Sequence, residues 1–143
     1  MIAKISTGRN IQGMLNYNEK KVKKGTASLI LTNGYTDQVS NLSFYDKLEA
    51  FTELNSKNQR TKTNAVHISL SFFANDKVDT HTMQVIVDSY MEQIGFGDQP
   101  YLVYKHFDTN HPHIHLVTTN IRSNGSRINM HNLGKTKSEA ARK

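Results

Sequence analysis

The sequence predicts an α+β domain, with a central, mostly antiparallel sheet of about five strands and helices packed on it. Three observations predict this class. Short apolar or alternating runs recur along the chain, stretches with helical apolar spacing lie between them, and the last two runs are joined by a short polar loop. We expect an antiparallel pair at that loop and helices that cover one face of the sheet.

Composition favours one folded domain over residues 1–143. Hydrophobic residues make up 36% of the chain and charged residues 21%, which is typical of a globular protein. No apolar run approaches the roughly 18 residues that a membrane span needs, and the first residues lack the apolar stretch of a secretory signal. Cysteine is absent, which excludes disulfides, thiol nucleophiles and thiolate metal sites. We expect a soluble intracellular domain.

In the first half of the chain, the pattern predicts a strand, a helix, a second strand and a second helix. Residues 1–7 alternate apolar and polar positions, as a short strand does. The apolar residues of 11–25 recur at helical spacing, and those of 26–32 form a short run that ends in an Asn-Gly turn signal. Residues 43–55 follow a helical stripe that begins with the Ser-x-x-Asp pattern of an N-cap.

The second half contains the clearest strand, at 65–73, where apolar and polar residues alternate strictly. A helix is expected over 80–94, capped by its first residue and stopped by the glycines that follow. Residues 100–107 and 112–121 are predicted as two strands of a hairpin. The last stretch, 135–143, begins like a helix.

Charge points to a polyanion as partner. Lys and Arg number 18 against 12 Asp and Glu, which gives a net charge of +6. The excess gathers at 20–24 and again from Arg122 to the end of the chain. Such patches attract nucleic acid, because phosphate contacts release condensed counterions. From charge alone, a merely solvated basic surface remains an equal alternative.

The predicted hairpin carries four of the seven histidines: His106, His111, His113 and His115. On a strand, His113 and His115 leave the same face, with Ile114 and Leu116 on the opposite, core-facing side. An antiparallel partner strand would place His106 opposite or diagonal to that pair. Three imidazoles on two neighbouring strands are then close enough to bind one metal ion. The alternative is a polar sheet face that carries histidines without a metal.

Three nitrogen ligands with open coordination positions suit Zn, Mn, Co or Ni, and open positions indicate catalysis or substrate binding. A phosphate oxygen is a natural occupant in a basic domain, where the metal would act as a Lewis acid. Without cysteine, the nucleophile is water, Ser, Thr, His or Tyr. Of the six tyrosines, Tyr17 lies off the apolar stripe of its helix in polar, basic surroundings. Half-exposed packing is the alternative for Tyr17.

Three segments resemble the motifs of conjugative relaxases, mobilisation nucleases of the HUH endonuclease superfamily, and are most similar to the Vir/Mob type. Residues 106–117 (HFDTNHPHIHLV) resemble the third motif, with its histidine–hydrophobic–histidine core. Residues 67–72 (HISLSF) resemble the second motif, in which Ser71 is the better match for a serine that contacts DNA near the nick. Residues 15–18 (LNYN) resemble the first motif, which carries the catalytic tyrosine. The motifs follow the family order.

The resemblance implies a site- and strand-specific nicking enzyme at the origin of transfer of a mobilisable plasmid or conjugative element. Tyr17 would attack the scissile phosphate of single-stranded DNA and form a 5′-phosphotyrosine link. His106, His113 and His115 would hold a divalent metal, with Mg or Mn in use and Zn, Ni or Co also compatible. The resemblance also implies a monomer in the bacterial cytoplasm that meets relaxosome accessory proteins and a coupling protein, and that is exported covalently bound to DNA. The chain is then expected to be the N-terminal nuclease part of a longer protein.

The resemblance also suggests roles for neighbouring residues. Asp108 would orient a metal-ligating histidine or help to take the tyrosine proton. Orientation is the better match, because a carboxylate with a pKa near 4 is a poor base for a phenol with a pKa near 10. His111 is a second-shell residue, a base or a DNA contact, and His67 borders the site. Candidate phosphate contacts are Arg9, Lys20, Lys21, Arg122 and Arg127, each with an ordinary surface charge as the alternative.

Three other functions remain open from the sequence. A replication initiator or transposase of the same superfamily typically carries its tyrosine after the histidine pair, whereas no tyrosine follows His115 here. A non-catalytic, metal-dependent DNA-binding module would bind DNA without covalent capture. A small-molecule metalloenzyme with three histidines would show no salt-sensitive DNA binding.

Overall fold

The computed structural model describes residues 1–36, 38–73, 78–107, 111 and 113–130, so Asp108 and the helix expected at 135–143 lie outside the described residues. Within them the elements follow in this order: β1 (Ile2–Gly8), α1 (Ile11–Lys23), β2 (Ala27–Asn33), the 3₁₀ turn η1 (Val39–Asn41), α2 (Phe44–Asn55), β3 (Ala65–Ser71), α3 (Thr80–Gln93), β4 (Tyr101–His106) and β5 (His113–Thr119). Each predicted strand and helix within the described residues is confirmed, with bounds that move by no more than two residues.

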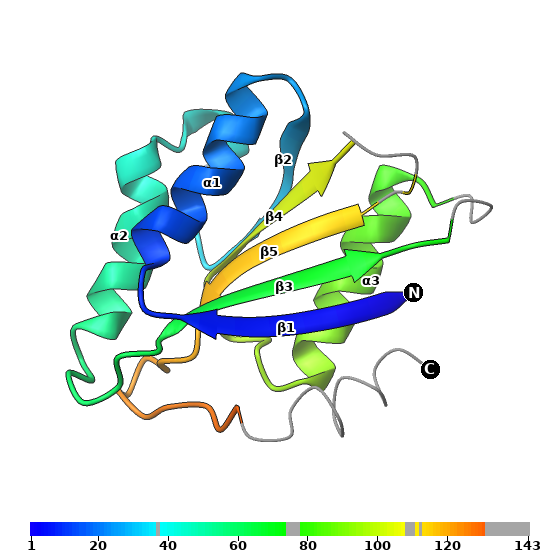
Figure 1. The fold of residues 1–143 in the computed structure, drawn as a ribbon. Helices are drawn as coiled ribbons and strands as arrows, with labels where there is room; N and C mark the ends of the chain where they lie inside the picture. Colours follow the sequence, from blue (N-terminus) through cyan, green and yellow to red (C-terminus); the bar gives the residue numbers. More distant parts are fainter. Residues whose placement is uncertain (37, 74–77, 108–110, 112, 131–143) are drawn as a thin grey trace.

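The strands form one five-stranded sheet in the order β1-β3-β5-β4-β2. Every neighbouring pair is antiparallel. The predicted hairpin is present as β4 and β5, in which His106 lies directly opposite His113. The strands β3, β5 and β4 are the inner strands of the sheet (Figure 1). The histidines therefore have paired backbone on both sides, with His106 at the end of β4 and His113 at the start of β5.

The helices cover both faces of the sheet, so the expectation of helices on one face is wrong (Figure 1). The buried side of α3 packs on one face, against residues such as Ile68, Leu70 and Leu116. Helices α1 and α2 pack on the other face, over Leu102 and Val117. The inner strands carry apolar side chains on both faces over part of their length, and each apolar area needs a helix to exclude water.

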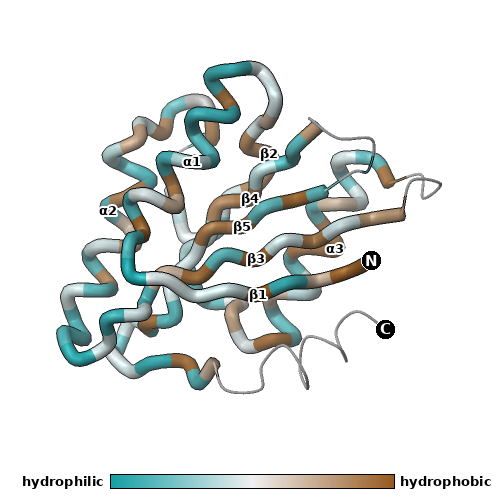
Figure 2. The backbone as a smooth tube through the Cα atoms, viewed as in Figure 1, coloured by the Kyte–Doolittle hydropathy of each residue, from teal (hydrophilic) through white to brown (hydrophobic). Residues whose placement is uncertain are grey.

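Helices α1 and α2 cover only part of the face on which they pack, and the uncovered part carries polar side chains. Hydrophilic and hydrophobic positions alternate along β1, β3 and β5 (Figure 2). The register aligns Lys4 of β1 with Ser69 of β3, and Ser69 with His115 of β5. Lys4 is exposed, while Ser69 and His115 are half-buried. The fold therefore presents an open polar surface next to a helix-covered core.

Local capping sets where the helices begin. The predicted cap of α2 is confirmed as a capping box, in which Ser43 and Asp46 bond each other's backbone amides. Helix α3 is capped by Asp79 and not by Thr80, because the Asp79 carboxylate accepts the Thr82 amide and Thr80 is already helical. Among the described residues, none of the helices has the length and apolar character that a membrane crossing requires.

Candidate functional site

Four histidine side chains from three adjacent strands meet where the open polar surface borders α1, with His106 buried against that helix. The ring centres of His106 and His115 are 4.0 Å apart, and those of His106 and His113 are 5.4 Å apart. His67 of β3 joins them, with its ring centre 4.8 Å from that of His115. The structure thus brings together the three predicted ligands and places His67 in contact with one of them.

Hydrogen bonds link these rings into a chain. His113 Nδ1 lies 3.1 Å from His115 Nε2, and His115 Nδ1 lies 2.9 Å from His67 Nε2. Burial lowers the pKa of His67, because a charged imidazole is poorly solvated there. The cluster therefore favours a neutral His67, which orients the ring of His115 through its second nitrogen.

The fourth ring, that of His106, is hydrogen-bonded to Asn18 of α1. Asn18 is fully buried, and its side-chain oxygen accepts a hydrogen bond from His106 Nε2 at 2.9 Å. Its amide nitrogen donates to the carbonyl of Met14, which fixes the orientation of the amide group. Sequence reasoning missed Asn18. A signal was present, because Asn18 occupies the apolar stripe of α1 begun by Ile11 and Leu15.

Tyr17 precedes Asn18 and leaves the helix in a different direction, since successive residues of a helix are turned by about 100°. Its side chain is 54% exposed, unlike the fully buried Asn18. Lys21, one turn further along α1, places its Nζ 5.6 Å from the centre of the Tyr17 ring. The side chain of Tyr17, the predicted nucleophile, is thus accessible, and the ammonium group of Lys21 lies over its ring. The next residue along the chain, Asn18, makes the contact with His106.

The position of α1 over the sheet is also fixed by Glu19. One carboxylate oxygen forms an ion pair with Lys47 of α2 at 2.8 Å, and the other accepts the Tyr104 hydroxyl at 2.5 Å. Burial, together with the nearby Glu19, raises the pKa of Tyr104 far above its ordinary value. Tyr104 therefore remains a hydroxyl donor. Three consecutive residues of α1 thus have different roles: Tyr17 is exposed, Asn18 bonds His106, and Glu19 bonds Lys47 and Tyr104.

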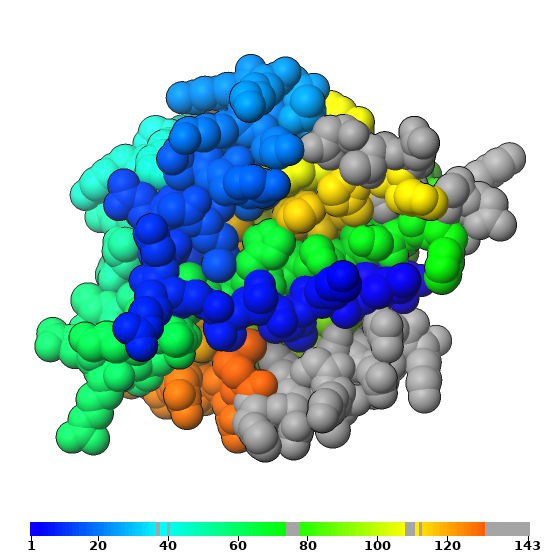
Figure 3. All heavy atoms as spheres, viewed as in Figure 1, coloured from blue at the N-terminus to red at the C-terminus, as the bar shows by residue number. Residues whose placement is uncertain are grey.

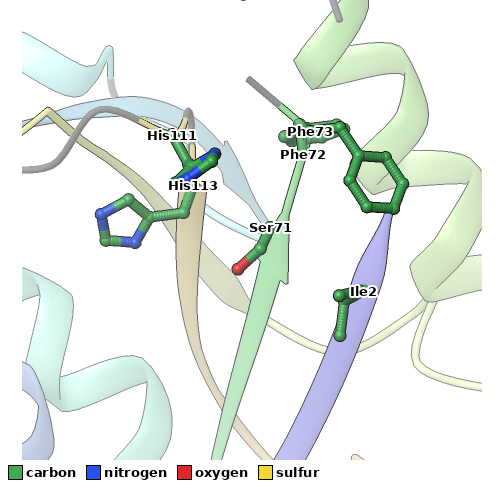
Figure 4. Close-up of a pocket in the computed structure, with 6 residues that line it drawn as sticks. All are labelled: Ile2, Ser71, Phe72, Phe73, His111 and His113. Atoms are coloured by element: carbon green, nitrogen blue, oxygen red, sulfur yellow. The ribbon is translucent and has the colours of Figure 1, made fainter. Parts of the chain in front are cut away.

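A cavity of about 410 Å³ adjoins the histidine cluster. It is lined by Ile2, Ser71, Phe72, Phe73, His111 and His113 (Figure 4). In Figure 4 the Ser71 hydroxyl points toward the histidine side, whereas the Phe73 ring lies on the side of Ile2. Ile2 and Phe73 are 47% and 55% exposed. The predicted residues Ser71 and His111 thus lie beside His113, next to an apolar wall that sequence reasoning did not identify.

The predicted phosphate contacts divide into separate places. Lys20 and Lys21 lie beside Tyr17 on α1. Arg9 and Arg127 line a second cavity, away from the histidines, and Arg122 donates to the Arg127 carbonyl in a nearby turn. The structure therefore does not gather all five residues around the histidine cluster.

The donor set suits a metal ion, although no three His, Asp or Glu side chains of the described residues are arranged to hold one in this conformation. The two nitrogens of His113 and His115 are 3.1 Å apart. Two nitrogens bound to one tetrahedral ion at about 2.0–2.1 Å lie about 3.3 Å apart. A small rotation of the two rings would therefore replace their mutual hydrogen bond by coordination of one shared ion. Neutral imidazoles are common ligands of divalent metals.

Comparison with known proteins agrees with this geometry. A family model described as the MobA/VirD2-like nuclease domain of relaxases matches residues 17–143. No curated protein matches the chain. The family match begins at the candidate nucleophile Tyr17, includes every clustered histidine and covers most of the sequence. The chain therefore belongs to the relaxases, a family of DNA-nicking proteins, as a MobA/VirD2-like nuclease domain.

Proposed function

We propose that this domain nicks and rejoins one DNA strand at an origin of transfer, with Tyr17 as the nucleophile. The observation that carries the proposal is the hydrogen bond from His106 to Asn18, which joins the histidine cluster to the helix of Tyr17. The contact fixes the backbone of Tyr17 one residue away from a site whose histidines suit a phosphate-binding metal. Family membership supports the same chemistry.

In the proposed step, Tyr17 Oη attacks the phosphorus of the scissile phosphodiester. A bond forms between the phenol oxygen and phosphorus, and the bond from phosphorus to the 3′ oxygen breaks. The proton that the phenol loses is balanced by the proton that the leaving 3′ oxygen gains. The products are a 5′-phosphotyrosine and a free 3′-hydroxyl, and attack by that hydroxyl reverses the step.

His106, His113 and His115 are the residues that would hold a divalent cation. When bound, such an ion polarises a phosphate oxygen and offsets negative charge that builds on phosphorus. His67 orients His115, and Asn18 orients His106. These contacts fix the direction of two rings before DNA arrives, which lowers the reorganisation that binding requires.

The DNA strand would lie along the open polar surface. Lys20 and Lys21 attract its phosphates beside Tyr17, and Ser71 donates to a phosphate or sugar next to His113. The exposed ring of Phe73 offers a stacking surface for one base in the adjacent cavity, as aromatic side chains do in other single-strand binders. Accessory proteins at the origin and a coupling protein complete the proposed assembly.

The test uses labelled single-stranded oligonucleotides that tile the transfer origin of the element carrying the gene. The full-length protein is incubated with each oligonucleotide and Mn²⁺ or Mg²⁺, and the products are separated under denaturing conditions. We expect a protein–DNA band that resists denaturant and disappears in Tyr17→Phe. Salt-sensitive binding without such a band would favour a non-catalytic DNA-binding module, and no DNA binding at all would reject the proposal.

A further inference from the structure

We propose that the second cavity, at the end of the sheet away from Ser71, binds phosphates of the same DNA strand that the histidine cluster cuts. The cavity has a volume of about 560 Å³. It is lined by Arg9, Asn58, Arg60, Thr61, Lys62, Thr63 and Arg127. We refer to it as the basic basin. The inference rests on the proposed nicking function and extends the DNA footprint beyond the catalytic site.

The topology of the sheet gathers the cations of the basic basin. Arg9 follows the last residue of β1, and residues 60–63 precede the first residue of β3. These two strands are antiparallel, with Gly8 paired to Ala65, so both segments leave the sheet at the same end of the strands. Ala65 is in turn paired with the last residue of β5, and Arg127 belongs to the segment that follows that strand. Three chain segments therefore bring four cationic side chains to one end of the sheet.

Charge and chemistry favour phosphate as the ligand. Among the described residues that line the basin, four are cationic and none is acidic. The hydroxyls of Thr61 and Thr63 add neutral hydrogen-bond donors. Charged guanidinium and ammonium groups with neighbouring hydroxyls are the usual contacts of a nucleic-acid backbone.

The two loops that carry these cations are tied to each other. The Asn58 side chain donates to the Gly125 carbonyl at 3.0 Å and accepts the Thr61 amide at 3.1 Å. Lys57 Nζ donates to the carbonyl of Ser123 at 3.0 Å. Gly125 has a φ of +86°, and a Cβ there would lie 3.0 Å from the Lys57 carbonyl oxygen, so the close approach of the loops requires glycine. The basin is therefore held in shape before any ligand binds.

Its distance from the histidines favours a long polyanion. Strand β3 runs from Ala65, beside the basin, to Ser71, beside the first cavity. At about 3.3 Å per residue, this separation is about 20 Å. Figure 3 shows the outer side chains of β3 open between α1 and β1. Lys4, Ser6 and Ser69 belong to this open surface, which joins the two cavities with polar groups. A single strand of several nucleotides spans both sites, whereas a mononucleotide does not.

The test compares the double variant Arg60→Ala/Lys62→Ala with Lys23→Ala/Lys24→Ala, which removes the same charge from the end of α1. Binding of oligothymidylates of about 20 and about four nucleotides is measured over a range of NaCl concentrations. Wild type should prefer the long oligomer strongly, because only that oligomer reaches both sites. In the basin variant the preference should fall at least about tenfold, and the slope of log K against log salt should lose about 1.4, or about 0.7 per phosphate contact. The lysine variant, whose charges belong to the basic run at 20–24, should weaken binding of both oligomers alike and so keep the preference.

Circular dichroism and thermal unfolding of both variants show whether the fold is intact, and Arg60→Lys/Lys62→Arg should restore the preference for the long oligomer. An unchanged preference and slope in a folded Arg60→Ala/Lys62→Ala protein would overturn the proposal. A loss seen only with duplex DNA would overturn it as well. If the basin variant behaves as expected but no covalent adduct forms with wild type and origin DNA, the proposed nicking function fails and the basin remains a DNA site.

Discussion

The buried side chain of Asn18 accepts a hydrogen bond from His106 Nε2 at 2.9 Å, across 88 positions of the sequence. This contact joins α1 to the inner strand β4 at the point where the histidines gather. It assigns the proton of His106 to Nε2, because the amide oxygen of Asn18 is only an acceptor. The residue next to Tyr17 thus sets both the tautomer of one histidine and the position of the helix.

Asn18→Ala should weaken both the fold and covalent DNA capture. The substitution removes the acceptor of a buried N–H group, which costs about 1–3 kcal/mol of unfolding free energy. It also releases α1 from His106, so the rate of adduct formation should fall by more than the DNA affinity. Urea unfolding measures the first effect, and a capture time course with a binding titration measures the second.

Asn16→Ala serves as the matched control, since Asn16 is exposed on the same helix. Its unfolding free energy should stay within about 0.5 kcal/mol of wild type. If Asn18→Ala behaves like this control in stability and in capture, the contact with His106 has neither role.

Tyr17→Phe removes only the hydroxyl of a side chain that is 54% exposed. Stability should therefore change by no more than about 0.5 kcal/mol, and DNA binding should stay close to that of wild type. Covalent capture should disappear, because the remaining ring has no oxygen to attack phosphorus. Denaturing electrophoresis with labelled DNA measures capture, and Tyr45→Phe, which alters another exposed tyrosine, should retain it. A persistent adduct in Tyr17→Phe would assign the nucleophile to another residue.

Much of the fold could be predicted from periodicity, because the core depends on local patterns that each element carries by itself. The alternation in β3 and the spacing in α3 both describe residues that the structure buries. The two-sided covering of the sheet could not be predicted in this way. It depends on the strand order, in which β3 lies between β1 and β5 and both of its faces meet other elements. Pairing over such separations leaves no local signal.

The candidate site was predictable where its residues share one hairpin. The two-residue spacing of His113 and His115 fixes their common face, and a short connection aligns His106 with them. His67 was expected to border the site, and its contact with His115 follows from the pairing of β3 with β5. Asn18 comes from another element, and sequence reasoning missed it because its contact with the cluster depends on how α1 packs. Arg60 and Lys62 were missed for the same reason. They look like ordinary loop charges until the strand ends bring them beside Arg9.

His67→Ala should weaken metal binding without preventing folding. His67 Nε2 lies 2.9 Å from His115 Nδ1 and orients that ring, and loss of such a contact typically costs 10–100-fold in metal affinity. Isothermal titration of the metal-free protein with Mn²⁺ or Zn²⁺ measures the effect. The control is His81→Ala, because His81 is exposed near the start of α3. Equal affinities in the two variants would separate His67 from the metal site.

Glu19→Gln should destabilise the domain strongly, because it leaves Lys47 without its counter-ion. The two side chains are only 15% and 10% exposed, and removing one partner of such a buried pair typically costs about 3–5 kcal/mol. The Tyr104 hydroxyl would also lose a charged acceptor.

The double variant Glu19→Gln/Lys47→Met should recover much of that stability, because no unpaired charge remains in the interface between α1 and α2. Urea unfolding of wild type, Glu19→Gln, Lys47→Met and the double variant forms a complete cycle, and the pair should show a coupling energy above about 1 kcal/mol. Additive effects would mean that the ion pair contributes nothing specific. In that case, the position of α1, and with it that of Tyr17, would depend on the contact between Asn18 and His106, on the hydrogen bond from Tyr104 to Glu19 and on apolar packing.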